Sequence, residues 1–301
     1  MRILKKNITN LFGKNGEEWL ISLPKVVKKL AQQWSLAHIK PVNNMSWNYV
    51  ALAFQENSLP IVLKISCDKQ IIQDEYKALR HFDGHGSIKV LAINWQYNAL
   101  LLQQAIPGHC LKELHPQKLA ETIKIYSAVV QVLATPKIYD NSTAHVSQWC
   151  NAVDRITDSR IEKFFVDKAK QLRSALLNTA QPEYLCHGDL HLENILQHGS
   201  HWLAIDPKGI IGDTAFEAAA FALLSPDELK DSQQVTSKLI DRVEKLSITL
   251  GIDFNRLLAW IFLRTIISAQ WFIEDNGEPS ESLDERLTLA KHVYPILRSS
   301  H

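Results

Sequence analysis

Paired cysteines and an excess of charge are the first things that this sequence lacks. Its four cysteines, Cys67, Cys110, Cys150 and Cys186, are widely spaced and form no C-x-x-C motif. Without a secretory context, such cysteines are expected to be reduced thiols and not a disulfide framework. The formal net charge is only +1, so the overall charge gives no reason to expect nucleic acid or an anionic membrane as a partner.

Long apolar runs are missing as well. No stretch approaches the roughly 20 uninterrupted apolar residues of a membrane span. Residues 1–16 mix Lys and Asn with short apolar pieces and lack an apolar signal core followed by small residues. We therefore expect a soluble cytoplasmic protein, and the sequence leaves its oligomeric state open. With 301 residues, 46% of them hydrophobic, the chain is long enough for two domains with apolar cores.

The hydrophobic pattern divides the chain into a strand-rich first part and a helical second part. In the first part, helical spacing at 17–34 and 68–82 alternates with short β-rich runs. These runs lie at 49–54, 61–66, 88–94 and 100–104. After the break at Pro107-Gly108 the spacing is mainly helical. The helical segments are 116–133, 146–157, 161–177, 225–250 and 254–274.

This pattern predicts an α+β protein. We expect a small antiparallel β-sheet lobe with a helix at 1–105 and a larger, mainly helical lobe at 106–301. The helical pattern is interrupted at 183–213, a stretch rich in Gly, Asp, His and Asn with short apolar runs at 195–196 and 202–205. The candidate chemistry lies in this interruption.

The stretch from His187 to Asn194 reads H-G-D-L-H-L-E-N, and Asp206 follows a short apolar run. Phosphoryl transfer to an alcohol needs a carboxylate that orients the hydroxyl and accepts its proton, together with hard oxygen ligands for Mg²⁺. Asp189 and Asn194 have the spacing of a kinase catalytic loop, with four residues between the Asp and the Asn. Asp206 is placed where a second metal-binding carboxylate is expected.

Two residues of the first part fit the same reaction. Lys64 ends the apolar run 61–63, the setting of a lysine that holds the α- and β-phosphates of ATP. Glu75 lies on the following predicted helix and could pair with this lysine. Taken alone, a lysine at the end of a strand is usually a solvated edge residue, and a helix glutamate is usually exposed. Their order before the Asp189 loop favours the functional interpretation.

On these motifs the chain resembles the aminoglycoside phosphotransferase branch of the protein-kinase-like superfamily. More narrowly, it resembles the streptomycin 6-phosphotransferase and hydroxyurea resistance kinase family. The resemblance runs from about Glu17 to the region of Trp271. The segments that carry it are 46–50, 62–64, 75–80, 99–102, 187–196, 205–209 (I-D-P-K-G) and 212–216.

The resemblance implies a bilobal fold, ATP and Mg²⁺ as cofactors, and a role for each matching residue. Asp189 would be the catalytic base, Asn194 and Asp206 would hold the metal, and Lys64 with Glu75 would bind phosphate. Adenine would bond to the backbone, and a loop would cover the phosphates. The residues expected for these two tasks are Gln103, Gln104 and Ala105 for adenine, and Ser46 and Asn48 for the loop.

The acceptor expected from the resemblance is a hydroxyl of an aminoglycoside such as streptomycin. Lys208, Asp213 and Trp271 are candidate acceptor-binding residues, and Glu274 with Asp275 resembles an acidic pair that would suit a cation. Three features depart from the kinase pattern. The chain has no G-x-G-x-x-G motif, Asp-Pro-Lys replaces Asp-Phe-Gly, and Glu217 stands where the family usually has Asp.

Other functions remain open at this stage. The acceptor could be hydroxyurea or an unknown metabolite, because a fold does not decide a substrate. The chain could also bind nucleotide without catalysing transfer. Four histidines around the loop permit a metallohydrolase site, although Gly188 and Asn194 would serve no purpose in it. These histidines are His187, His191, His198 and His201.

Overall fold

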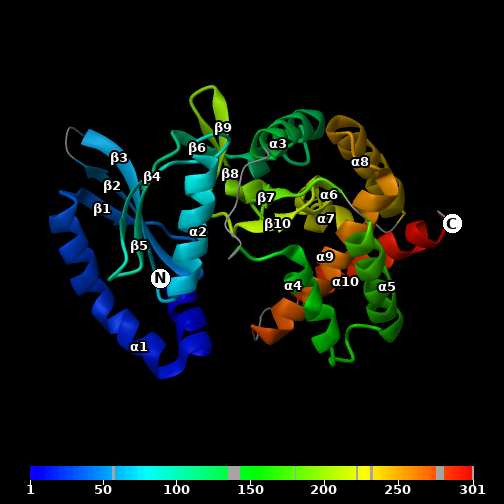
Figure 1. Ribbon diagram of the computed structural model, residues 1–301, viewed down its shortest axis with the longest axis horizontal. Coiled ribbons are helices and arrows are strands. Elements are labelled where there is room, and N and C mark those ends of the chain that lie inside the picture. Colours follow the sequence, from blue (N-terminus) through cyan, green and yellow to red (C-terminus); the bar gives the residue numbers. More distant parts are fainter. Residues whose placement is uncertain are drawn as a thin grey trace. The chain divides into compact units, whose positions relative to one another are not determined.

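The computed structural model describes residues 1–55, 58–134, 143–179, 181–221, 223–230, 233–275 and 281–299. The chain forms two compact units (Figure 1). The first contains Met1–Gly108 with His198–Leu203, and the second contains His109–Gln197 with Ala204–His301. Residues 198–203, the tip of a later hairpin, thus group with the first unit although they lie beyond the boundary expected from sequence.

The first unit is built on one five-stranded antiparallel sheet, with strand order β1-β2-β3-β5-β4. The two hairpins expected from the apolar runs are β2–β3 and β4–β5. The edge strand β1 was not predicted. The strand bounds are β1 Ala37–Pro41, β2 Asn48–Gln55, β3 Leu59–Ser66, β4 Val90–Asn94 and β5 Ala99–Gln103.

The two faces of this sheet are covered by different helices. Side chains alternate along a strand, so Ile61, Leu63 and Ile65 of β3 share one face, where they join the apolar cluster of α1 (Arg2–Gln33). Lys64 falls on the opposite face, against which α2 (Lys69–Phe82) packs (Figure 1). The alternation that builds the core therefore turns Lys64 toward α2.

Helix α1 is longer than the segment predicted from periodicity. It starts at Arg2 and bends at Gly13, whose backbone (φ 53°, ψ −131°) is not helical. The first half contributes Leu4 and Ile8 to the same cluster as Leu23 and Leu30 from the second half. The sequence pattern predicted a helix that starts near residue 17, which is too short. Only two residues of the first half are deeply buried, too few to produce a clear helical periodicity of apolar residues.

The second unit is mainly helical, as predicted. Its central helix α9 covers Phe254–Glu274, and α5, α6, α8 and α10 pack against it (Figure 1). By length and composition α9 could cross a membrane, but 67% of its apolar window is buried inside the structure. The other helices are α3 Leu119–Leu133, α4 Val146–Cys150, α5 Lys163–Asn178, α6 Thr214–Ala218, α7 Pro226–Lys230, α8 Val235–Leu250 and α10 Glu281–Ser299.

Short strands hold the polar interruption in place. β7 (Tyr184–Cys186) pairs with β10 (Ile210–Gly212), so the segments before and after the loop lie antiparallel. β8 (Ile195–His198) and β9 (His201–Ala204) form a hairpin, and β6 (Pro107–Cys110) adds to β8. The fold belongs to the α+β class expected from sequence, and helix α10 is an element that the sequence pattern did not predict.

Candidate active site

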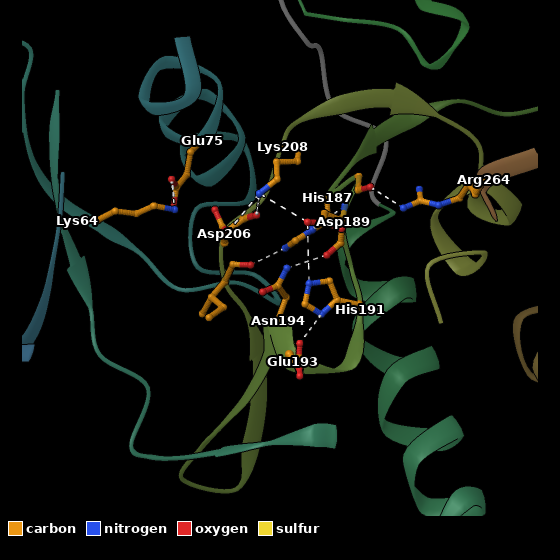
Figure 2. Close-up of polar contacts among 12 residues, drawn as sticks. Lys64, Glu75, His187, Asp189, His191, Glu193, Asn194, Asp206, Lys208 and Arg264 are labelled. Atoms are coloured by element: carbon orange, nitrogen blue, oxygen red, sulfur yellow. Dashed lines mark hydrogen bonds and ion pairs between the residues drawn. The ribbon is translucent and has the colours of Figure 1, made fainter. Parts of the chain in front are cut away.

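Lys64 and Glu75 form a buried ion pair in the first unit. Lys64 Nζ lies 2.6 Å from Glu75 Oε2, and the two side chains are 6% and 2% exposed (Figure 2). Glu75 occupies the apolar side of α2 between Ile72 and Leu79, so its charge is tolerated there only with a cationic partner. The pair fixes the ammonium group at one place on the sheet.

The segment expected to bind adenine is anchored at both ends. At the end of β5, the Gln103 backbone N–H donates to the Lys89 carbonyl at 2.9 Å. Three residues later, the Ile106 N–H donates to His198 Nδ1 at 3.2 Å, and the Ile106 carbonyl accepts from the Gly199 N–H at 2.7 Å. Gln104 and Ala105 lie between these anchors. The role of His198 as an anchor was not predicted.

The loop proposed to cover the phosphates precedes β2. The Ser46 carbonyl accepts a hydrogen bond from Asn7 Nδ2 at 3.0 Å, which ties the loop to α1. Among the described residues, Asn48 Oδ1 is buried without a hydrogen-bond partner. A phosphate oxygen has no proton to donate to it, so only the amide N–H₂ of Asn48 suits a phosphate contact.

The loop from His187 to Asn194 in the second unit is held by its first residue. His187 is fully buried, its Nε2–H donates to the Ile205 carbonyl at 2.7 Å, and its Nδ1 accepts from the Asp189 N–H at 3.2 Å (Figure 2). Burial lowers the pKa of His187 to about 4, so the ring is neutral at physiological pH with one fixed tautomer. His187 is a structural support below the loop, as expected.

Gly188 is required by both conformation and space. Its φ is +85°, and a Cβ added there would lie 2.9 Å from Ile210 Cγ2 and 3.2 Å from Trp149. Its N–H donates to both carboxylate oxygens of Glu217, at 3.2 and 3.3 Å, and its carbonyl accepts from Arg264 Nη2 at 3.0 Å. Both polar groups of this peptide are therefore fixed next to Asp189.

Glu217, which stands where the family usually has Asp, is buried in α6. Burial raises its pKa to about 7, while the Arg264 guanidinium and the loop N–H groups act in the opposite direction. Arg264 also stacks over the Phe216 ring at 4.6 Å. Glu217 thus braces the Asp189 loop with a longer side chain than Asp has. No sequence motif pointed to Arg264, which reaches the loop from α9.

Asn194 and Asp206 are neighbours through the backbone. The Ile205 N–H donates to the Asn194 carbonyl at 2.9 Å, and Asn194 Nδ2 donates to the Asp189 carbonyl at 2.8 Å. The amide nitrogen of Asn194 is thereby engaged, which leaves its oxygen for a cation. Asp206 adopts a left-handed backbone (φ 59°), an uncommon conformation outside glycine that often marks functional sites.

These two side chains fit a magnesium ion. Both offer hard oxygen donors, which Mg²⁺ prefers. A cation already lies beside Asp206 in the structure, because Lys208 Nζ is 3.2 Å from its Oδ2 (Figure 2). The same ammonium lies 3.7 Å from Asp189 Oδ2.

A pocket of about 540 Å³ opens beside Asp189 within the second unit. Trp149 and Trp271 form an aromatic wall, with their rings 5.1 Å apart and nearly perpendicular. Arg286 lines the pocket too, and its Nε donates to Ser268 Oγ at 2.8 Å. Trp271 was expected at an acceptor site, whereas no sequence motif predicted Trp149 or Arg286 there.

Three other residues expected at the acceptor site are absent from the lining of this pocket. Asp213 is 7% exposed, caps the N-terminus of α6 and forms an ion pair with Arg256. Glu274 is engaged by Arg155, whose Nε and Nη2 donate at 2.8 and 3.0 Å. Asp275 follows at the C-cap of α9, where burial raises its pKa. Of the five candidates, Lys208 and Trp271 line the pocket and these three acidic residues do not.

The histidines of the loop form no metal cluster in the part of the chain that the structure describes, where no group of three or more His, Cys, Asp or Glu side chains could hold a metal ion. His187 is used for support and His198 for anchoring, as described above. His191 lies near Asp189, with Nε2 4.0 Å from Asp189 Oδ2. It also lines the pocket.

Comparison with known proteins agrees with this geometry. The family model described as aminoglycoside/hydroxyurea antibiotic resistance kinase matches residues 34–276. Streptomycin 3''-kinase of Klebsiella pneumoniae is 32% identical over 235 residues, covering 74% of this chain and 84% of that protein. Streptomycin 6-kinase of Streptomyces glaucescens is 24% identical, covering 91% of each chain. Hydroxyurea phosphotransferase of Kitasatospora aureofaciens is 24% identical, covering 87% and 77%.

Solved structures show the same fold at lower identity. An aminoglycoside phosphotransferase, solved as a ternary complex with ADP and hygromycin B, has a TM-score of 0.64 and 15% identity, and the match covers 90% of this chain and 97% of that one. A choline kinase from Streptococcus pneumoniae has a TM-score of 0.64 and 12% identity, covering 91% and 99%. The chain therefore belongs to the aminoglycoside/hydroxyurea antibiotic resistance kinase family and is a phosphotransferase.

Proposed function

We propose that this protein transfers the γ-phosphoryl group of Mg²⁺-ATP to a hydroxyl of a small molecule, with an aminoglycoside such as streptomycin as the first candidate. The observation that carries the proposal is the position of Asp189. Asp189 lines a pocket large enough for a small molecule, its backbone carbonyl accepts from the Asn194 amide, and its carboxylate shares the Lys208 ammonium with Asp206. We propose that the protein acts in the cytoplasm.

Each residue has a defined task in this reaction. Asp189 accepts a hydrogen bond from the acceptor hydroxyl, orients its oxygen toward the γ-phosphorus and takes up the proton as the new P–O bond forms. The bond between the γ-phosphorus and the β–γ bridging oxygen breaks, and ADP leaves. Lys64, fixed by Glu75, would bind the α- and β-phosphates. Asn194 and Asp206 would hold Mg²⁺, which neutralises phosphate charge when bound.

The support for the acceptor comes from relatives and from the pocket. Two relatives are streptomycin kinases, and the Trp149–Trp271 wall suits the apolar face of a ring. One observation favours the second candidate, hydroxyurea. Arg264 and Arg286 both line the pocket, and Asp189 is the one carboxylate among its described lining residues. Such a surplus of positive charge suits a neutral acceptor better than a polycation.

The test is a coupled assay of ADP release with Mg²⁺-ATP, in which streptomycin, other aminoglycosides and hydroxyurea are added in turn. We expect one acceptor class to stimulate release, and Asp189→Asn to lower that stimulated rate by about 10²–10⁴-fold while nucleotide binding remains. Asp227→Asn, at a side chain that is 93% exposed, is the matched control and should behave as wild type. An unchanged rate in Asp189→Asn would refute the assignment of the base.

A further inference from the structure

Lys208 is the second residue after Asp206, and its backbone is tied to the catalytic loop. Its N–H donates to the His187 carbonyl at 2.7 Å, and the Gly209 N–H reaches the same carbonyl at 3.3 Å. The turn that carries Lys208 is therefore fixed against the turn that carries Asp189. His187 thus holds the backbone of Lys208 through its carbonyl and the backbone of Asp189 through its ring.

The ammonium of Lys208 is shared between two carboxylates. It lies 3.2 Å from Asp206 Oδ2 and 3.7 Å from Asp189 Oδ2 (Figure 2), and the three side chains are each between 34% and 39% exposed. A lysine placed only for stability would gain little from such partly solvated pairs. The same ammonium faces the pocket in which an acceptor would sit.

The other cations of the pocket wall are engaged elsewhere. Arg264 donates to the Gly188 carbonyl at 3.0 Å and stacks on Phe216. Arg286 donates to Ser268 Oγ and to the Ser282 carbonyl, at 2.8 and 2.6 Å. Among the described cationic residues that line the pocket, Lys208 alone forms ion pairs with both Asp189 and Asp206.

We propose that Lys208 binds the transferring phosphoryl group, a role that rests on the function proposed above and differs from the acceptor contact expected from sequence. The flexible stem of a lysine allows its ammonium to leave Asp206 when that carboxylate takes a metal, without losing Asp189. The ammonium then bonds to a non-bridging oxygen of the γ-phosphoryl group. It neutralises charge there while the acceptor oxygen bonds to phosphorus, the proton passes to Asp189 and ADP departs.

This role predicts a difference between two nucleotides. ADP lacks the group that Lys208 contacts, whereas a non-hydrolysable ATP analogue with a β–γ nitrogen bridge has it. Titration calorimetry with Mg²⁺ should show that Lys208→Met weakens binding of the analogue by roughly 10-fold and changes ADP binding by less than about twofold. The turnover number should fall about 10²-fold, and the KM of the acceptor should stay within about twofold.

Two further variants make the test selective. Lys208→Arg keeps the charge and should retain part of the preference for the analogue. Lys112→Met is the control: it removes a lysine that forms an ion pair with Glu193, a residue of the loop that does not line the pocket. This variant should bind both nucleotides as the wild-type protein does. Lys208→Gln replaces the methionine variant if that protein does not fold.

The outcomes separate this inference from the proposed function. Equal weakening of ADP and the analogue, or a rise in the acceptor KM alone, would overturn the role of Lys208 while the kinase function stands. If the wild-type protein binds neither nucleotide with Mg²⁺, the proposed function fails, and the role of Lys208 fails with it.

Discussion

Replacing Glu75 by Gln should destabilise the first unit strongly. The substitution leaves the Lys64 ammonium, only 6% exposed, without its charged partner 2.6 Å away. Removing one member of a buried pair costs about 3–5 kcal/mol, because the remaining charge has left water and has lost the opposite charge that compensated its burial. In a thermal unfolding experiment this corresponds to a fall of roughly 10 °C or more.

The chain provides a control with the same distance and different burial. Lys163 and Asp167 also lie 2.6 Å apart, but their side chains are 87% and 59% exposed. Asp167→Asn makes the same change from carboxylate to amide and should alter stability by no more than about 0.5 kcal/mol. If Glu75→Gln is as mild as Asp167→Asn, burial does not govern the energy of this pair and the reasoning is wrong.

A double variant distinguishes stability from function. Replacing both partners with apolar residues, as in Lys64→Met with Glu75→Leu, removes the isolated charge and should recover most of the lost stability. Nucleotide binding should remain impaired, since no ammonium is left for the phosphates. Recovery of nucleotide binding together with stability would show that Lys64 does not contact the nucleotide.

Three further predictions concern the second unit. Asp206→Asn should raise the Mg²⁺ concentration needed for ADP binding, and an unchanged Mg²⁺ titration would contradict the metal assignment. Because the pKa of Glu217 rises from 4.5 to about 7 on burial, the folded state binds a proton that the unfolded state has released. Stability should therefore fall by about 3 kcal/mol as pH rises from 4.5 to 7, and Glu217→Gln should flatten this dependence in urea unfolding measured at several pH values. Asp213→Asn should lower the melting temperature, because it removes the charge paired with Arg256, yet leave the acceptor KM unchanged; a large rise in KM with unchanged stability would restore Asp213 to the acceptor site.

The elements that could be predicted from sequence are those whose cause is local. The β2–β3 hairpin follows from alternation over a few residues on each side of a polar turn. Helix α9 follows from one apolar pattern that runs from Phe254 to Glu274. The first half of α1 has no such pattern, because it owes its burial to Leu4 and Ile8 meeting a sheet formed later in the chain. Contacts with residues far away in sequence do not appear in the local periodicity of apolar residues.

The same distinction applies to single residues. Glu75 taken alone resembled an exposed helix charge, and only its order relative to Lys64 suggested the buried pair that the structure contains. Asp213 lies in a segment that carries the family resemblance, which made it a candidate for the acceptor. Its partner Arg256 is 43 residues away, on another helix, and no spacing rule connects them. An acidic residue next to a motif can therefore have structural contacts, here the Arg256 ion pair and the cap of α6, that the motif does not reveal.

The catalytic loop can be recognised in the sequence because its contacts require a fixed spacing. Asn194 has to reach back to the Asp189 carbonyl, and the measured 2.8 Å bond is possible only at a short, defined separation along the chain. The pocket wall has no such requirement, since Trp149, Arg264 and Arg286 come from three different helices and can change one at a time. The relatives named for streptomycin are 32% and 24% identical to this chain and the relative named for hydroxyurea is 24% identical, and identities this low do not decide between the two acceptors. A contact within one short segment can thus be recognised in the sequence, whereas the pocket wall depends on side chains that meet only in the folded protein.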